Sequence, residues 1–230
     1  MIAAAPPYVS LTASLPALGP LLAAKAPPIN QPTLEHRLKG LAPQDHRDLM
    51  ALRDVVSWTR IALAESDAAL LARARRVEAS LRSEALRVLL RDRLEIRTVV
   101  AALRKRAAGE DAPPAGEVWG YGRFTEVIRA NWGVPDFGVG RSFPWVVAAR
   151  EKLDAGDRKG FERIVLEAAW VSGSRRLADH HFDLEAVVRY VLQWALVDRW
   201  ARYDEDTASA RFGELLDAAL TDLPQKMADA

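Results

Sequence analysis

The sequence contains no cysteine, which excludes disulfides, thiolate catalysis and cysteine-ligated zinc sites. No run of about 18 uncharged apolar residues can continue as a helix, because prolines interrupt the most apolar stretch, so we expect no membrane span. Residues 1–7 carry no Lys or Arg ahead of their apolar side chains, and Pro6-Pro7 interrupts them, which argues against a signal peptide. We therefore expect a cytoplasmic protein.

The composition is that of a folded protein rather than a disordered chain. Of the 230 residues, 50% are hydrophobic and 27% are charged, and a chain of this length can bury a substantial core. No series of strands and no alternation of strands with helices is visible. The sequence predicts an all-α protein, a helical bundle or a funnel-like helical array, organised as one domain over residues 1–230.

Helical periodicity and helix-forming residues cover most of the chain. Residues 68–107 contain neither Gly nor Pro, and we expect this long stretch to break near Ser80 to Ser83. Asp183 is the expected cap of an apolar helix that begins at Leu184. The other helices are expected from Pro32, capped by Thr33, to Gly40, and over residues 45–64, 144–155, 157–171, 184–203 and 207–220.

Two segments depart from this pattern. Residues 8–12, Tyr-Val-Ser-Leu-Thr, alternate apolar and polar side chains, which indicates a short strand or an extended arm. Residues 109–140 are rich in Gly and Pro, so we expect irregular structure there, interrupted by a short helix near Phe124 to Ala130. This segment divides the chain into two helical halves.

Charge is distributed unevenly although the net charge is only +1. Residues 67–107 hold eleven Arg and Lys against five Asp and Glu, whereas residues 179–230 hold five against eleven. The two parts either face each other or present two surfaces to partners of opposite charge. The arginines of residues 67–107 fit three interpretations. They form a solvated helix face with ion pairs such as Glu78 with Arg82, or they bind a partner protein. A contact with nucleic acid is the least favoured of the three.

One arginine of this part is unusual. Arg93 lies on the apolar stripe between Leu89 and Ile96, where a charge is costly unless it is paired. It would form an ion pair inside the bundle, or it would line a concave surface that holds another subunit. The candidate partner-binding residues of the chain are Arg73, Arg75, Arg76, Arg93 and Arg97.

Catalytic signatures are missing or fail their context. His46-Arg47-Asp48-Leu49 and Asp136-Phe137-Gly138 resemble kinase fragments, but the first falls inside a predicted helix and no phosphate-binding glycine loop accompanies them. No Gly-Lys-Ser/Thr motif occurs. The sequence thus predicts a non-catalytic protein with no cofactor.

His180 and His181, flanked by Asp179 and Asp183, form the one cluster of metal-ligand types. Adjacent residues of a helix point about 100° apart, so the two histidines would not converge on one ion. We expect capping and surface roles and no metal site. An unfamiliar enzyme site built on these four residues is the least favoured alternative.

Short segments in matching order resemble a small bacterial family of unknown function that is encoded alongside V/A-type ATPases. This family looks like a shortened form of their C-type central-stalk subunit, the d-type in eukaryotes. The segments are Tyr8 to Leu18, Leu41 to Asp45, Glu95 to Arg104, Asp136 to Gly138, and Phe182 to Tyr190 continuing to Asp198-Arg199-Trp200. The chain is shorter than the C-type protein usually is.

This resemblance implies a helical socket that couples the central shaft of a rotary ATPase to its membrane rotor ring and binds no nucleotide. The expected partners are the central-stalk and membrane-ring subunits, and the protein would lie peripheral to the inner membrane through its complex, with a role in ion or proton transport. The alternative is a free-standing helical adaptor or scaffold with another protein partner.

Overall fold

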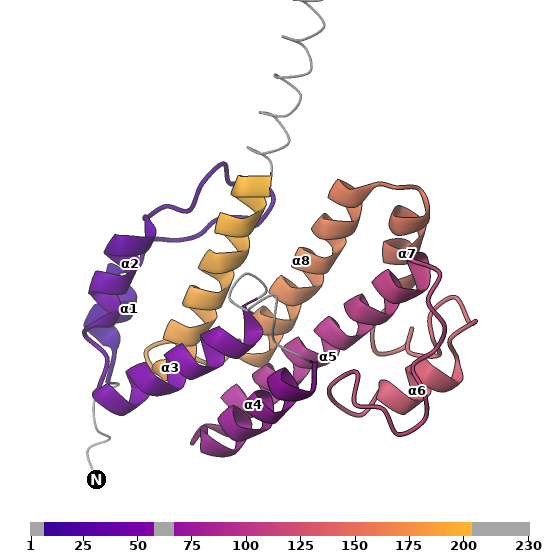
Figure 1. Ribbon diagram of the computed structural model, residues 1–230. Coiled ribbons are helices and arrows are strands. Elements are labelled where there is room, and N and C mark those ends of the chain that lie inside the picture. Colours follow the sequence, from indigo (N-terminus) through magenta and orange to yellow (C-terminus); the bar gives the residue numbers. More distant parts are fainter. Residues whose placement is uncertain (1–6, 58–66, 204–230) are drawn as a thin grey trace, which may run out of the picture.

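The computed structural model describes residues 7–57 and 67–203, which fold into a bundle of helices (Figure 1). No strand occurs in these two ranges, so the all-α prediction is confirmed. The helices are α1 (Val9–Ser14), α2 (Gln31–Leu38), α3 (Pro43–Val56), α4 (Asp67–Ser80), α5 (Glu84–Ala107), α6 (Thr125–Ala130), α7 (Val146–Asp154), α8 (Arg158–Arg176) and a last helix over residues 184–203.

Helix α5 is the longest helix among the described residues and packs against α3, α7 and α8. Its first half contributes Leu86, Leu89 and Leu90 to a core shared with α2, α3, α4 and the 184–203 helix. Its second half contributes Val99 and Leu103 to a second core formed with α6, α7 and α8. Figure 1 shows α5 running across the molecule from α4 toward α7. One continuous helix therefore joins the two cores.

The predicted break before α5 is confirmed. Helix α4 ends at Ser80, and Ser83 caps α5 by accepting a hydrogen bond from the Leu86 N–H at 3.3 Å. The chain needs this break because one straight helix over residues 67–107 would be about 60 Å long and could not fold back on the core. Asp183 likewise caps the 184–203 helix, since its Oδ1 accepts from the Ala186 N–H at 2.9 Å.

The segment over residues 109–140 has the predicted irregular course, with α6 as its helix. It is fastened to the end of α5 by Arg106, which donates to the carbonyl oxygens of Trp132 and Val134 at 3.0 and 2.8 Å. The same guanidinium stacks over the Phe137 ring, 3.9 Å from its centroid. The fragment that contains Phe137 therefore closes a structural turn against α5.

The prediction of a strand or extended arm at residues 8–12 is wrong, because Val9–Ser14 forms α1. The Tyr8 hydroxyl donates to Asp45 and accepts from the Ala42 N–H at 3.2 Å, which anchors this short helix at the start of α3. Tertiary contacts thus override the local alternation of polar and apolar residues.

Three predicted helix boundaries also need correction. Asn30, not Thr33, caps α2, because its side chain accepts from the Thr33 N–H at 2.9 Å. Helix α3 ends at Val56, where two β-branched residues precede an extended Ser57, and residues 58–64 lie outside the described ranges. Helix α8 continues through Gly173 to Arg176, because Gly173 is buried where α8 packs on α5.

The 184–203 helix has the expected apolar surroundings, with Val187, Val188 and Val191 at most 1% exposed. The helix predicted over residues 207–220 lies outside the described residues. Within the described ranges, no helix is both long enough and apolar enough to cross a membrane.

Candidate functional site

The predicted partner-binding arginines of α4 differ in their surroundings. Arg73 is half-buried and donates from Nη1 to the Asp54 carbonyl oxygen at 3.2 Å, so it ties α4 to α3. Arg75 and Arg76 are exposed, and the described part of the chain gives neither of them an ion pair or a hydrogen bond. We call Arg75 and Arg76 the α4 arginine pair.

The other two predicted residues lie on α5 and do not join this pair. Arg93 is only 6% exposed, and Arg97 is half-buried. The ion pair expected for Arg93 inside the bundle is absent from the described residues, and its Nε atom has no hydrogen-bond partner. The five arginines therefore do not form one surface patch.

A polar cleft of about 640 Å³ opens beside Arg75, between α4, α5, α8 and the loop that follows Trp119. We call it the α4–α5 cleft. Its charged and polar lining consists of Arg75, Glu78, Arg91, Asp92, Glu95, Tyr121, Arg123 and Arg176. Its remaining lining residues are Val88 and Gly122, so within the described residues it lacks a Ser, Cys or His nucleophile or base.

Glu78 organises the α4 side of this cleft. Its carboxylate accepts hydrogen bonds from the Tyr121 hydroxyl and from Arg91 Nε. Burial alone would raise the pKa of Glu78, but these two donors hold it below its ordinary value. Burial and the hydrogen bond to Glu78 raise the pKa of Tyr121, so the hydroxyl stays protonated and donates. The predicted ion pair between Glu78 and Arg82 does not form, because Arg82 contacts Asp45 and Asp48 of α3 instead.

Glu95 lies deeper in the cleft and is 6% exposed. Its Oε1 accepts from the Arg123 N–H at 3.3 Å and lies 3.4 Å from Arg123 Nε. Burial raises the pKa of Glu95 despite these contacts. Asp92, the third carboxylate of the cleft, is paired with Arg176 of α8. Each acidic side chain of the cleft thus has its own arginine, as expected of a network that holds α4, α5, α8 and the loop together.

The close approach of the loop to α5 explains its two glycines. Gly122 has a φ of +90°, and a Cβ built on it would lie 2.5 Å from Glu95 Cγ. Gly120-Tyr121-Gly122 does not form a phosphate-binding loop. Its glycines allow the backbone to pass directly over α5 and place Tyr121 against Glu78.

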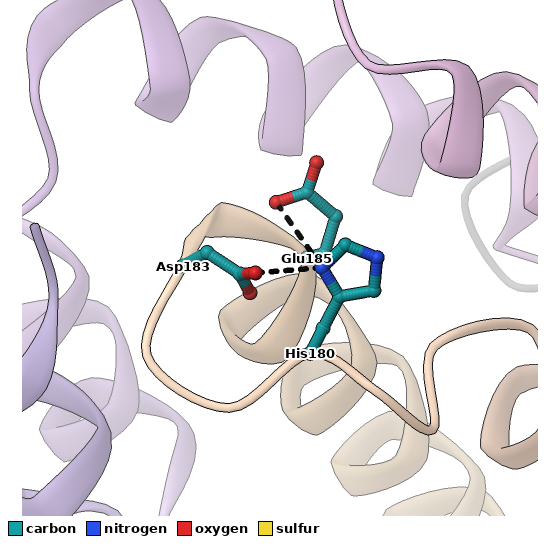
Figure 2. Close-up of side chains that lie close together, drawn as sticks. All are labelled: His180, Asp183 and Glu185. Atoms are coloured by element: carbon teal, nitrogen blue, oxygen red, sulfur yellow. Dashed lines mark hydrogen bonds and ion pairs between the residues drawn. The ribbon is translucent and has the colours of Figure 1, made fainter. Parts of the chain in front are cut away.

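The predicted histidine cluster is only partly assembled (Figure 2). His180 Nδ1 lies 2.6 Å from Asp183 Oδ2, in a hydrogen bond, and 3.9 Å from Glu185 Oε2. One ligand-type atom from each of these three residues lies within 4.8 Å of the others, close enough to share a metal ion. His181 is exposed and does not take part. Because Asp183 already caps the last helix, these contacts also serve to fix the start of that helix.

Residues 74–222, more than half of the chain, match the model of a family described as protein of unknown function (DUF2764). The chain belongs to this family. No curated protein and no solved structure matches the chain. The matched region of this DUF2764 member contains the whole lining of the α4–α5 cleft and all of α5, whereas α1, α2 and α3 precede it.

Sequence reasoning missed Tyr121, Arg123, Arg176 and Glu185 as members of these clusters. Tyr121 could have been found from its position between Gly120 and Gly122, because such glycines often mark a close backbone approach. Glu185 stands two residues after the capping Asp183, a spacing that gave no reason to join it to His180.

Proposed function

We propose that this chain is a non-catalytic subunit of a rotary V/A-type ATPase, similar to the C-type central-stalk protein, that couples the central shaft to the membrane rotor ring. The proposal rests on the resemblance of its segments to that family and on an all-α bundle of the kind such a socket needs. Three of the five resembling segments, from Glu95 to Trp200, fall inside the matched region.

The observation that carries the proposal is the α4 arginine pair. The carboxylates of the neighbouring cleft already have arginine partners, while Arg75 and Arg76 stand exposed without one in the described ranges. Two exposed arginines at consecutive positions of α4 suit an acidic surface of a partner protein that extends around this helix, because charge complementarity speeds association and fixes orientation.

The packing of α5 in two hydrophobic cores suits a coupling element. Helix α5 takes part in both cores, so a force applied at one end is carried through a continuous helix to the other. Closely packed cores deform little under load. The α4–α5 cleft adds ion pairs across α4, α5 and α8.

The test is recovery of partner subunits with the tagged protein. We expect the wild-type chain to copurify with central-stalk and membrane-ring subunits, and the double variant Arg75→Glu with Arg76→Glu to recover several-fold less. Arg141→Glu with Arg158→Glu is the matched control, since both residues are exposed and lie on the other half of the bundle. Recovery of a different protein set with the wild-type chain would instead favour a free-standing adaptor.

A further inference from the structure

Arg93 is a buried charge without a counterion. Its side chain is 6% exposed, its Nε has no hydrogen-bond partner, and the described residues provide no ion pair. The adjacent Asp92 is already paired with Arg176. Burial lowers the pKa of Arg93 to about 10, which still leaves the guanidinium charged at neutral pH. A buried charge in this condition is costly in free energy.

Arg93 lines a partly open cavity of about 490 Å³ between α2, α3, α5, α8 and the 184–203 helix. This volume lies within the range of small-molecule sites. Much of the wall is apolar, with Leu166 from α8 and Val191 and Leu196 from the last helix. The cavity thus combines one buried cation with an apolar chamber.

The other arginines of the cavity are already engaged. Arg202 Nε lies 3.0 Å from Asp198 Oδ2, Arg199 contacts Glu162, and Arg53 lies 3.9 Å from Glu35. These pairs leave Arg93 as the group that a ligand would have to neutralise. The unpaired charge of Arg93 also makes the cavity unfavourable for a cationic ligand, because like charges repel.

We propose that this cavity binds a small organic carboxylate with an apolar body, the carboxylate on Arg93 and the body against Leu166, Val191 and Leu196. A guanidinium can hold a carboxylate through two parallel hydrogen bonds, which suits this charge better than a phosphate-rich ligand that would need several free cations. The proposal concerns a different part of the molecule from the α4 arginine pair and does not depend on the rotary role.

The test uses the full chain and isothermal titration calorimetry with octanoate and with 1-octanol, which shares the apolar tail but lacks the charge. We expect the wild-type protein to bind octanoate at least about tenfold more tightly than octanol, as a charged hydrogen bond would give. Arg93→Met keeps an unbranched side chain but removes the charge. It should lower the affinity for octanoate about ten- to hundredfold and leave the affinity for octanol unchanged.

Two further variants separate the cavity from a general effect on charge or folding. Arg76→Met removes an exposed arginine from α4 and should leave both affinities unchanged. Ala195→Phe adds a ring at an exposed position of the cavity wall and should lower the affinity for both ligands. Ala72→Phe adds the same ring at an exposed position of α4 and should change neither affinity.

Thermal unfolding of Arg93→Met without ligand gives an independent readout. We expect its Tm to equal or exceed that of the wild type, because removing an unpaired buried charge relieves its desolvation cost. A wild-type protein that fails to bind octanoate, equal affinities for octanoate and octanol, or an Arg93→Met variant that keeps the preference for octanoate would each overturn the proposal. Unchanged binding by Ala195→Phe would also place the ligand outside this cavity.

Discussion

Glu95 is a carboxylate whose pKa is raised by burial in the folded protein. Burial raises its pKa above the ordinary value of 4.5, although Arg123 and Arg176 act to lower it; the side chain of Arg123 is 71% exposed, so solvent screens its charge. We predict that Glu95→Gln is at least as stable as the wild type at neutral pH, because the amide avoids the cost of burying a charge and can still accept from the Arg123 N–H.

The pH dependence of this effect has a definite sign. Below about pH 4.5 Glu95 is protonated in both the folded and the unfolded chain, so the two proteins should differ least. As the pH rises, the unfolded chain loses this proton first, and the wild type loses stability relative to Glu95→Gln until the folded pKa is passed. Urea unfolding at a series of pH values measures the difference, and a gap that widens toward acid would contradict the assignment.

We predict that Asp183 stabilises the start of the 184–203 helix mainly through its capping hydrogen bond. Its Oδ1 accepts from the Ala186 N–H at 2.9 Å, so Asp183→Ala should lower the free energy of unfolding by about 1 kcal/mol. Asp183→Asn can keep the same hydrogen bond and should cost a few tenths at most. Chemical denaturation compares the two, and equal losses would show that the interaction with His180, not the cap, is what stabilises this turn.

At this scale the sequence predicts local partners and misses distant ones. The cap at Asp183 and the break before Ser83 follow from residue types a few positions apart, and both are confirmed. The partners of Glu78 are Arg91 and Tyr121, the latter 43 residues away, so no local spacing could have indicated them. The burial of Arg93 could be predicted from its place between apolar residues on one face of α5. Its lack of an ion pair in the described ranges could not, because it depends on how α8 packs.

At the scale of elements, the loop after Trp119 should be sensitive to any side chain that separates it from α5. Gly122→Ala combines a positive φ with a Cβ 2.5 Å from Glu95 Cγ. Gly116 has a similar φ of +81° but open space around it, so Gly116→Ala isolates the backbone term, about 1–2 kcal/mol. We predict that Gly122→Ala costs about 1–3 kcal/mol more than this control.

Thermal or urea unfolding of both variants measures that difference. Equal losses would mean that Glu95 moves aside freely and that the loop does not pack closely on α5. The helices themselves were easier to predict than this loop, because periodicity reports which residues share a face, whereas a close backbone approach depends on tertiary contact. The same distinction explains why residues 8–12 form α1, held by Tyr8 on α3, rather than an extended segment.

In the whole molecule, α5 joins the two largest of the hydrophobic cores of the described residues, an arginine pair is exposed on α4, and Arg93 is buried without an ion pair in the described ranges. The all-α class followed from composition and periodicity. Composition and periodicity could not predict which arginines are paired, exposed or buried, because that depends on which helices pack together. This packing separates Arg75 and Arg76 from Arg73, which serves the contact between α4 and α3.

The most direct test of the coupling role is quantitative mass spectrometry of the proteins recovered with the tagged, full-length chain from its own cells. Our account predicts shaft and rotor-ring subunits of a V/A-type ATPase in the wild-type sample, several-fold fewer with Arg75→Glu and Arg76→Glu, and wild-type amounts with Arg141→Glu and Arg158→Glu. Recovery of no ATPase subunit with the wild-type chain, or equal recovery with both double variants, would contradict it.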